Sequence, residues 1–102
     1  MILTVDGLRQ GQLVISTAGR DQGRHYLIWN TLGERFLEVV DGEKHPLDRP
    51  KKKNVKHVRV TMSVATEVEQ ALLESKPIKD AQIVAAIQRR KNELEEGDRF
   101  HG

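Results

Sequence analysis

The stretch GQLVISTAGRDQGR, residues 11–24, sets three glycines around a short hydrophobic run and a charged pair. Gly11 precedes the run, while Gly19 and Gly23 follow it and enclose an Arg-Asp pair. Glycine tolerates a positive φ at a tight reversal and lets the backbone come close to a partner, because it has no Cβ. The stretch therefore predicts a β-strand that runs into a tight loop with a charged tip.

Further short runs of strand character follow within the first sixty residues, separated by Gly, Pro and Asp-Gly turn signals. They are rich in Val, Ile, Leu and aromatic residues, as strands usually are. The expected strands cover residues 13–17, 25–29, 36–40, 45–47 and 55–62. Asp41-Gly42 comes directly after the third run and is typical of a tight hairpin tip. Four to five short strands predict a small β-barrel, because closure removes exposed sheet edges.

The periodicity changes to that of a helix after residue 62. A first helix is expected over residues 66–74, with Thr66 as its N-cap, and it ends before Pro77 because the residue preceding a proline leaves the α region. A second helix is expected to begin at Asp80 as N-cap and to continue to about residue 95. Gly97 is the expected stop, with a frayed tail beyond it.

The 102 residues therefore predict a mainly β protein with a helical tail. Its expected parts are a barrel domain over residues 1–62 and a helical extension over residues 63–102. Ile83, Val84 and Ile87 form an apolar stripe on the second helix, which is expected to pack on the barrel or on the first helix.

The composition is that of a soluble, charge-rich globular chain, with 37% hydrophobic and 31% charged residues. The sequence has no cysteine, which excludes disulfides and thiolate metal sites. No apolar run approaches the roughly 20 residues of a membrane span. The four histidines lack i, i+4 spacing, and no nucleophile, P-loop or dinucleotide motif is present. These features predict a cytoplasmic, non-enzymatic protein with no cofactor, no metal, no membrane contact and no small-molecule substrate.

The net charge of +2 hides an uneven distribution along the chain. Residues 1–60 hold eleven Lys and Arg against seven acids, whereas residues 61–102 hold six against eight. The segment RPKKKNVKHVR, residues 49–59, contains six Lys and Arg, one His and no acid. Such a block is either a solvated surface that guards a strand edge or a surface that binds phosphates. We favour the second interpretation, because further bases follow the lysine triplet.

Residues 11–28 resemble the KOW motif, a strand-loop element of RNA-associated small barrels, through Gly11, Gly19, Gly23 and the apolar strand that follows. The similarity covers about residues 9–60 and includes, in order, GRDQG, Asp41-Gly42 and LDRPKKKNVKH. This order is similar to that of KOW-domain large-subunit ribosomal proteins of the archaeal and eukaryotic type. The resemblance implies an SH3-like barrel without catalysis that binds structured ribosomal RNA, as a ribonucleoprotein component in translation. Gln22 departs from the motif, which usually has Lys or Arg there.

The predicted RNA contacts are basic residues of the loop and of the lysine-rich segment, which would grip backbone phosphates and read little sequence. They are Arg20, Arg24, Arg49, Lys51, Lys52, Lys53, Lys56, His57 and Arg59. The motif turn consists of Gly11, Gly19, Asp21 and Gly23. Arg20 and Asp21 could instead form an exposed turn-tip ion pair of little energetic weight.

Two alternatives remain open from the sequence. Tyr26 and Trp29 are expected on opposite faces of a strand, so that one could stack on RNA bases while the other fills the core. The protein could also be a docking module that binds ribosomal or transcription-machinery proteins through its helical tail. DNA binding by a helix in the major groove is not favoured, since no helix is basic along one face.

Overall fold

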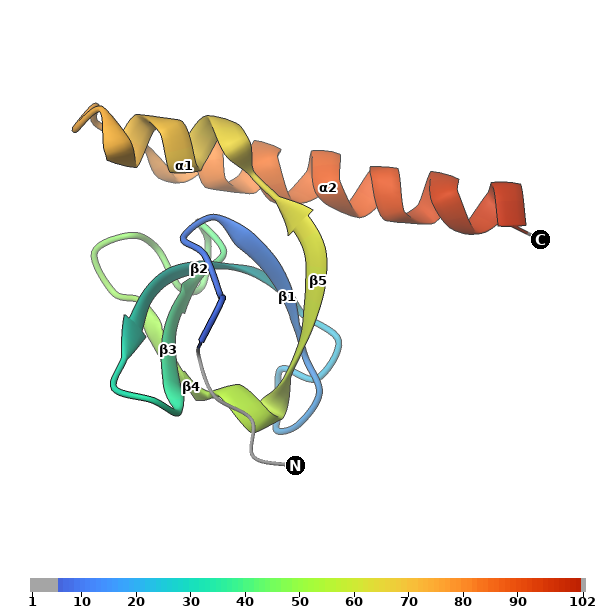
Figure 1. Cartoon of the computed structure of the whole chain (residues 1–102), viewed down its shortest axis with the longest axis horizontal. Helices are drawn as coiled ribbons and strands as arrows, with labels where there is room; N and C mark the ends of the chain where they lie inside the picture. Colours follow the sequence, from blue (N-terminus) through green and yellow to red (C-terminus); the bar gives the residue numbers. More distant parts are fainter. Residues whose placement is uncertain (1–5, 102) are drawn as a thin grey trace.

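The computed structural model describes the backbone of residues 6–101 and side chains up to residue 95. The fold is a five-stranded antiparallel sheet followed by two helices (Figure 1). The elements are β1 (Gln12–Ser16), β2 (His25–Leu32), β3 (Phe36–Val40), β4 (Lys51–Asn54), the 3-10 helix η1 (Val55–His57), β5 (Val58–Val64), α1 (Thr66–Leu73) and α2 (Asp80–His101). The strand order is β4-β3-β2-β1-β5, so β4 and β5 form the two edges.

The lysine-rich segment differs most from its prediction. A single strand over 55–62 was expected, but the chain forms β4, then η1, then β5. β4 pairs with β3 at one edge of the sheet and β5 pairs with β1 at the other, so the chain between them has to turn. Asn54 supports this turn, because its side chain accepts a hydrogen bond from the backbone N–H of Lys56 at 3.0 Å.

The connection between β3 and β4 is also longer than predicted. Residues 41–50 form a ten-residue loop, and the strand expected at 45–47 is absent. Asp41 accepts hydrogen bonds from the backbone N–H groups of Glu43 and His45, both at 2.9 Å, which gives the loop its shape. The chain bends after Asp41, but the tight hairpin tip expected at Asp41-Gly42 is wrong, because a ten-residue loop leads from β3 to β4.

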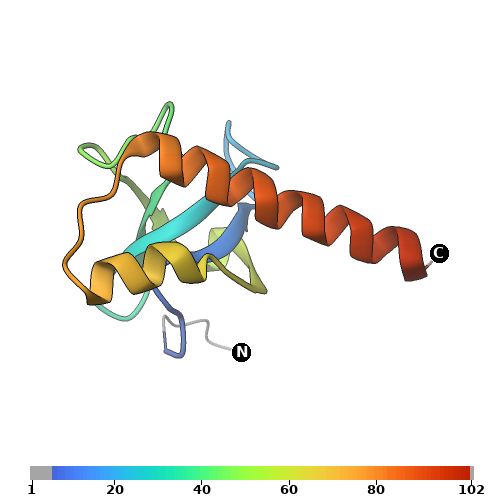
Figure 2. The same cartoon turned by 90° about the horizontal axis from the view of Figure 1, so that it is seen from above.

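The two faces of the sheet bury two separate clusters. Leu13 pairs with Leu27 on the face that the helices cover, and these side chains pack with Ile83 of α2. Val14 pairs with Tyr26 on the opposite face, where Leu37, Val39, Val55 and Val58 complete the second cluster. Figures 1 and 2 show both helices on one side of the curved sheet, with α2 projecting beyond it. The helical part therefore shares its core with the sheet.

The ends of the helices correct three sequence predictions. α1 begins at Thr66 itself, and its N-cap is Ala65, which makes no side-chain cap bond. α2 begins at Asp80 itself, which was expected to precede the helix as its N-cap. The carboxylate of Asp80 accepts a hydrogen bond from the backbone N–H of Leu47 at 2.8 Å and thereby fixes the 41–50 loop. α2 continues through Gly97 to His101, since a glycine inside a helix costs only about 1 kcal/mol and does not by itself end it.

Candidate nucleic-acid interface

Residues 17–24 connect β1 to β2 and form the loop at the centre of the site. The backbone N–H of Gly23 donates to Ser16 at 2.8 Å, and the N–H of Ser16 donates to Arg24 at 2.9 Å. Gly11, Gly19 and Gly23 have φ values of +85°, +90° and +90°. The positive φ expected from these glycines is therefore confirmed.

Asp21 lies at the centre of a hydrogen-bonded cluster beneath this loop. Its carboxylate accepts hydrogen bonds from the Tyr26 hydroxyl at 2.6 Å, from the Ser16 hydroxyl at 2.9 Å and from Lys53 Nζ at 3.1 Å. Lys51 Nζ lies 3.3 Å from the same carboxylate. The side chain of Asp21 is only 10% exposed. It therefore organises the loop from within, and its partners are these residues rather than Arg20, so the alternative of a turn-tip ion pair between Arg20 and Asp21 is wrong.

The cluster shifts the pKa values of its members in opposite directions. Burial raises the pKa of Asp21, but hydrogen bonds from Tyr26, Lys53 and Ser16 outweigh it and hold that pKa well below its usual range. The pKa of Tyr26 is raised by burial and by its hydrogen bond to Asp21. At neutral pH the carboxylate is therefore charged and the hydroxyl remains a donor.

The alternation of β4 separates the three lysines of the predicted phosphate-binding segment. Lys51 and Lys53 both reach Asp21, and Lys53 is only 8% exposed. Lys52 points the other way, is exposed, and places Nζ 4.5 Å from the centre of the Phe36 ring. The prediction that Lys53 contacts RNA is therefore corrected, because its ammonium is buried against a carboxylate.

Exposed bases gather at the end of the molecule where the 17–24 loop meets η1. The backbone N–H of Thr17 donates to His57 at 2.9 Å, and the N–H of Val55 donates to Arg35 at 2.8 Å. We call this surface the basic end, and its members are Arg20, Arg35, Lys56, His57 and Arg59. All five are exposed, and Arg59 is the register partner of Ile15 beside the loop.

Loop 17–24 and segment 54–59 contain no acid other than Asp21. Because that carboxylate is turned inward, neither of these two segments places an acid beside the exposed cations of the basic end. Arg35 was missed by sequence reasoning, since it lies in the short β2–β3 connection, distant in sequence from the other bases. Its contact with η1 continues the β3–β4 register, in which the neighbouring Phe36 pairs with Asn54.

Two further predicted contacts lie elsewhere. Arg24 donates to Asp41 at 3.1 Å and is partly engaged by this ion pair. Arg49 is exposed in the 41–50 loop, which is tied to α2 through Leu47 and Asp80. Among the described contacts, none joins Arg49 to the basic end. The structure therefore brings together only part of the predicted set.

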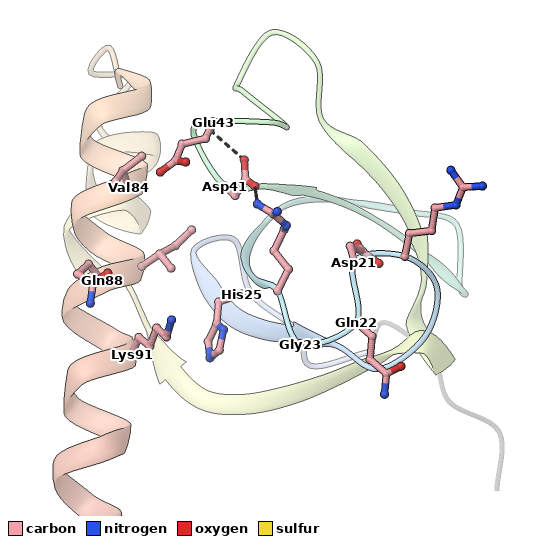
Figure 3. Close-up of a pocket in the computed structure, with 12 residues that line it drawn as sticks. Asp21, Gln22, Gly23, His25, Asp41, Glu43, Val84, Gln88 and Lys91 are labelled. Carbon is pink, nitrogen blue, oxygen red and sulfur yellow. Dashed lines mark hydrogen bonds and ion pairs between the residues drawn. The ribbon is translucent and has the colours of Figure 1, made fainter.

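A groove of about 380 Å³ lies between the 17–24 loop and α2 (Figure 3). Residues 20–25 form one wall, Asp41 and Glu43 lie at one end, and α2 forms the other wall with Val84, Ile87, Gln88 and Lys91. Burial lowers the pKa of His25, and the positive charges of Lys91 and Arg59 lower it further. His25 and Lys91 carried no sequence signal as site residues, because the docking of α2 brings them together.

The choice left open for the two aromatic residues of β2 is settled for one of them. Tyr26 is fully buried and packs in the cluster with Val14 and Leu37, so it cannot stack on a base without unfolding. Trp29 is partly buried and packs against the cluster beneath the helices. Tyr26 therefore has a role in core packing, and most of the Trp29 side chain is also used in packing against the core.

Within the described part of the chain, no group of three or more His, Cys, Asp or Glu side chains is arranged to hold a metal ion. Within residues 6–101, neither helix has the length and apolar character needed to cross a membrane. No protein-family model matches the chain, and no curated protein matches it significantly. Its function is therefore inferred from its residues and their geometry.

Proposed function

We propose that this protein is a non-enzymatic, cytoplasmic RNA-binding protein that associates with ribosomal RNA and acts in translation as part of a ribonucleoprotein. The observation that carries the proposal is the basic end, where exposed Arg and Lys side chains converge while the nearby carboxylate of Asp21 is turned inward. A surface of this kind attracts a polyanion, and folded RNA is the polyanion that a non-catalytic protein of this size would recognise by shape and charge.

Backbone phosphates are the expected ligands of the basic end. The guanidinium groups of Arg20 and Arg59 can grip a phosphate through two hydrogen bonds, and Lys56 can add a point charge. If about four phosphates are neutralised, log K should fall with log[salt] with a slope of about −3 to −4. Affinity would thus be strongly salt-dependent, while base sequence would matter little.

The fold is compatible with the proposed assignment to SH3-like barrels with a KOW motif. The sheet is curved, its edge strands β4 and β5 are consecutive in the chain, and the single turn η1 joins them. The glycine-containing loop that resembles the KOW motif lies next to η1 through the bond between Thr17 and His57. The residues that carry the resemblance and the exposed bases therefore occupy the same end of the sheet.

The alternative of a docking module has less support. It would bind ribosomal or transcription-machinery proteins through the apolar face of the helical tail, which would then have to be free. Ile83 is fully buried and Ile87 packs against the same cluster, so this face is used within the chain. RNA binding through the basic end makes no such demand.

The test is co-sedimentation with purified large ribosomal subunits at low and at raised salt. The informative variant is Lys56→Glu with Arg59→Glu, because both side chains are exposed in the basic end. The matched control is Lys76→Glu with Lys79→Glu, which changes the net charge equally at exposed positions near the start of α2. We expect salt-sensitive co-sedimentation of the wild type and the control, and at least a tenfold loss for the basic-end variant.

Equal losses in the two variants would show that net charge alone drives the association and would reject the basic end as the site. If the wild type does not co-sediment at either salt, the ribosomal assignment fails. Fluorescence anisotropy with a protein-free ribosomal RNA fragment then decides whether the protein binds RNA at all.

A further inference from the structure

The groove between the 17–24 loop and α2 has different chemistry at its two ends. Val84, Gln88 and Lys91 lie at i, i+4 and i+7 on α2, so they line about 10 Å of the groove on one helix face. Figure 3 shows Glu43 near Val84 at one end, and His25 near Lys91 at the other. The groove therefore has an exposed acid at one end and a base at the other, and its lining is mainly polar, with Val84 and Ile87 as apolar side chains on the α2 wall.

The charges that remain available in the groove are fewer than its lining suggests. Asp21 is neutralised within its cluster by Lys53 and Lys51. The carboxylate of Asp41 accepts hydrogen bonds from two backbone N–H groups and pairs with Arg24. Burial raises the pKa of Asp41, but these bonds outweigh burial and lower the pKa below its ordinary value. An occupant would thus meet Glu43 as the open acceptor.

The open cations of the groove are Lys91 and Arg20, which have no ion pair among the described residues. The α2 wall of the groove offers apolar contact. Val84 and Ile87 are half-buried and contribute methyl groups to the wall, next to the amide of Gln88. A ligand that fits has a flat apolar body, N–H donors at one end and an anionic group at the other. A nucleotide has these three parts in this order, and a volume of a few hundred Å³ is in the range of small-molecule sites.

We propose that this groove binds one unpaired nucleotide of the RNA, with the base against Val84 and Ile87 and the phosphate beside Lys91. Glu43 accepts a hydrogen bond from an exocyclic amino group of the base. The inference rests on the proposed function, and it assigns to α2 a part in RNA recognition. Single-stranded loops, whose unstacked bases can be splayed out, are the usual targets of such base recognition.

The position of the groove supports a continuous path for the RNA backbone. Arg59 of the basic end and His25 are both register partners of Ile15, and His25 lies near Lys91 of α2 (Figure 3), so the two basic surfaces lie on either side of this histidine. The lowered pKa of His25 keeps its ring mostly neutral near pH 7, which suits contact with a ribose or a base. An RNA strand that leaves the groove at Lys91 would pass directly to the basic end.

The choice of base follows from the acceptor at the Glu43 end of the groove. Cytosine, adenine and guanine carry an exocyclic amino group, whereas uracil carries none. A carboxylate in the position of Glu43 should thus favour cytidine over uridine nucleotides. Replacement by glutamine, which can also donate, should weaken this preference.

The first experiment is an NMR titration of the full chain, labelled at Val and Ile methyl groups, with CMP, UMP and ribose 5-phosphate. We expect saturable shifts at Val84 and Ile87 with CMP, at least threefold weaker binding of UMP, and no shift of these methyls with ribose 5-phosphate. Val14 and Val39 serve as internal controls, because they are buried in the other cluster. Glu43→Gln should bring CMP and UMP within twofold of each other.

The second experiment separates this inference from the proposed function. Lys56→Glu with Arg59→Glu should weaken binding to ribosomal RNA at least tenfold while CMP still shifts Val84 and Ile87. Glu43→Gln and Lys91→Gln should each weaken RNA binding three- to tenfold. If the wild type binds RNA but CMP leaves the groove methyls unmoved, the groove inference is overturned and the function stands. If CMP binds but RNA does not, the proposed function is overturned. The nucleotide that the groove binds would then not come from RNA.

Discussion

The 17–24 loop and the 41–50 loop are both built around an aspartate that is at most about a tenth exposed, but the hydrogen-bond donors to the two carboxylates come from different places. Asp41 is held mainly by backbone N–H groups two and four residues further along the chain. Asp21 is held by side chains, one of which, Lys53, is 32 residues away in sequence. The turn at Asp41 is thus held largely by local backbone bonds, whereas the side-chain cluster beneath the 17–24 loop is complete only when β4 has docked beside it.

The difference affects how the aspartate of each loop relates to the exposed side chains around it. In the 41–50 loop Asp41 is used internally and also engages Arg24, while Glu43 beside it remains exposed. A loop fixed from beneath by Asp21 keeps its tip free, so Arg20 and Gln22 remain exposed. The same cluster removes Lys53 from the surface. Four predictions test this contrast between the two loops.

The largest expected effect is that of Asp21→Asn. It leaves the buried ammonium of Lys53 without its counter-charge and should lower the free energy of unfolding by about 3–5 kcal/mol. Asp41→Asn should cost less, about 1–3 kcal/mol, because neutral backbone donors keep an amide oxygen as partner. Urea denaturation of both variants measures the difference. A larger loss for Asp41→Asn would reverse the ranking of the two loops.

The second prediction compares glycines that both have a positive φ. A Cβ on Gly42 would lie 2.6 Å from the carbonyl oxygen of Asp80 and 2.9 Å from a methyl group of Val84. A Cβ on Gly23 would have no neighbouring heavy atom within 4 Å. Gly42→Ala should therefore destabilise by about 1–3 kcal/mol more than Gly23→Ala, since α2 would have to move. Thermal unfolding of the two variants provides the measurement. Equal losses would mean that backbone strain alone is decisive.

The third prediction uses neighbouring lysines on opposite faces of β4. Lys53→Met should lower the free energy of unfolding by about 1–3 kcal/mol, because Asp21 loses a buried donor. Lys52→Met should change stability by no more than about 0.5 kcal/mol, because Lys52 is exposed and has no ion pair among the described residues. Urea unfolding of the two proteins gives the comparison. A Lys53→Met variant of wild-type stability would refute the buried role.

The smallest effect concerns pH. The pKa of Asp21 is lowered in the folded state, so its contribution to stability is complete above the ordinary value of about 4 and is lost as pH falls below it. The slope is at most about 1.4 kcal/mol per pH unit for one group. Tyr26 has the opposite sign, because its raised pKa gives stability that is lost as pH rises above about 10.

Unfolding between pH 2 and 5 should consequently show a shallower dependence for Asp21→Asn than for the wild type, and Tyr26→Phe should flatten the alkaline side. Asp41→Asn serves as the comparison on the acid side, since the pKa of Asp41 is also lowered. Unchanged slopes in Asp21→Asn would contradict the ionised cluster.

Local patterns predicted much of this fold. The run after Gly11, the strand at 36–40 and the two helices follow from side-chain periodicity and turn residues, which act over a few positions. The lysine triplet shows the limit of such reasoning. Three consecutive like charges predict a solvated surface, and nothing nearby in sequence reveals that alternation in β4 would direct two of them to Asp21.

The sequence by itself determined the strand-and-helix content, the tight glycine loop between β1 and β2 and the concentration of bases in its first sixty residues, because these depend on neighbouring residues. Only the tertiary structure decided which bases remain exposed, that Arg35 joins them, and that α2 encloses a groove with His25 and Lys91. The reason is that burial, pairing and groove formation depend on segments tens of residues apart, whose approach is fixed by the register of the sheet and the docking of the helices.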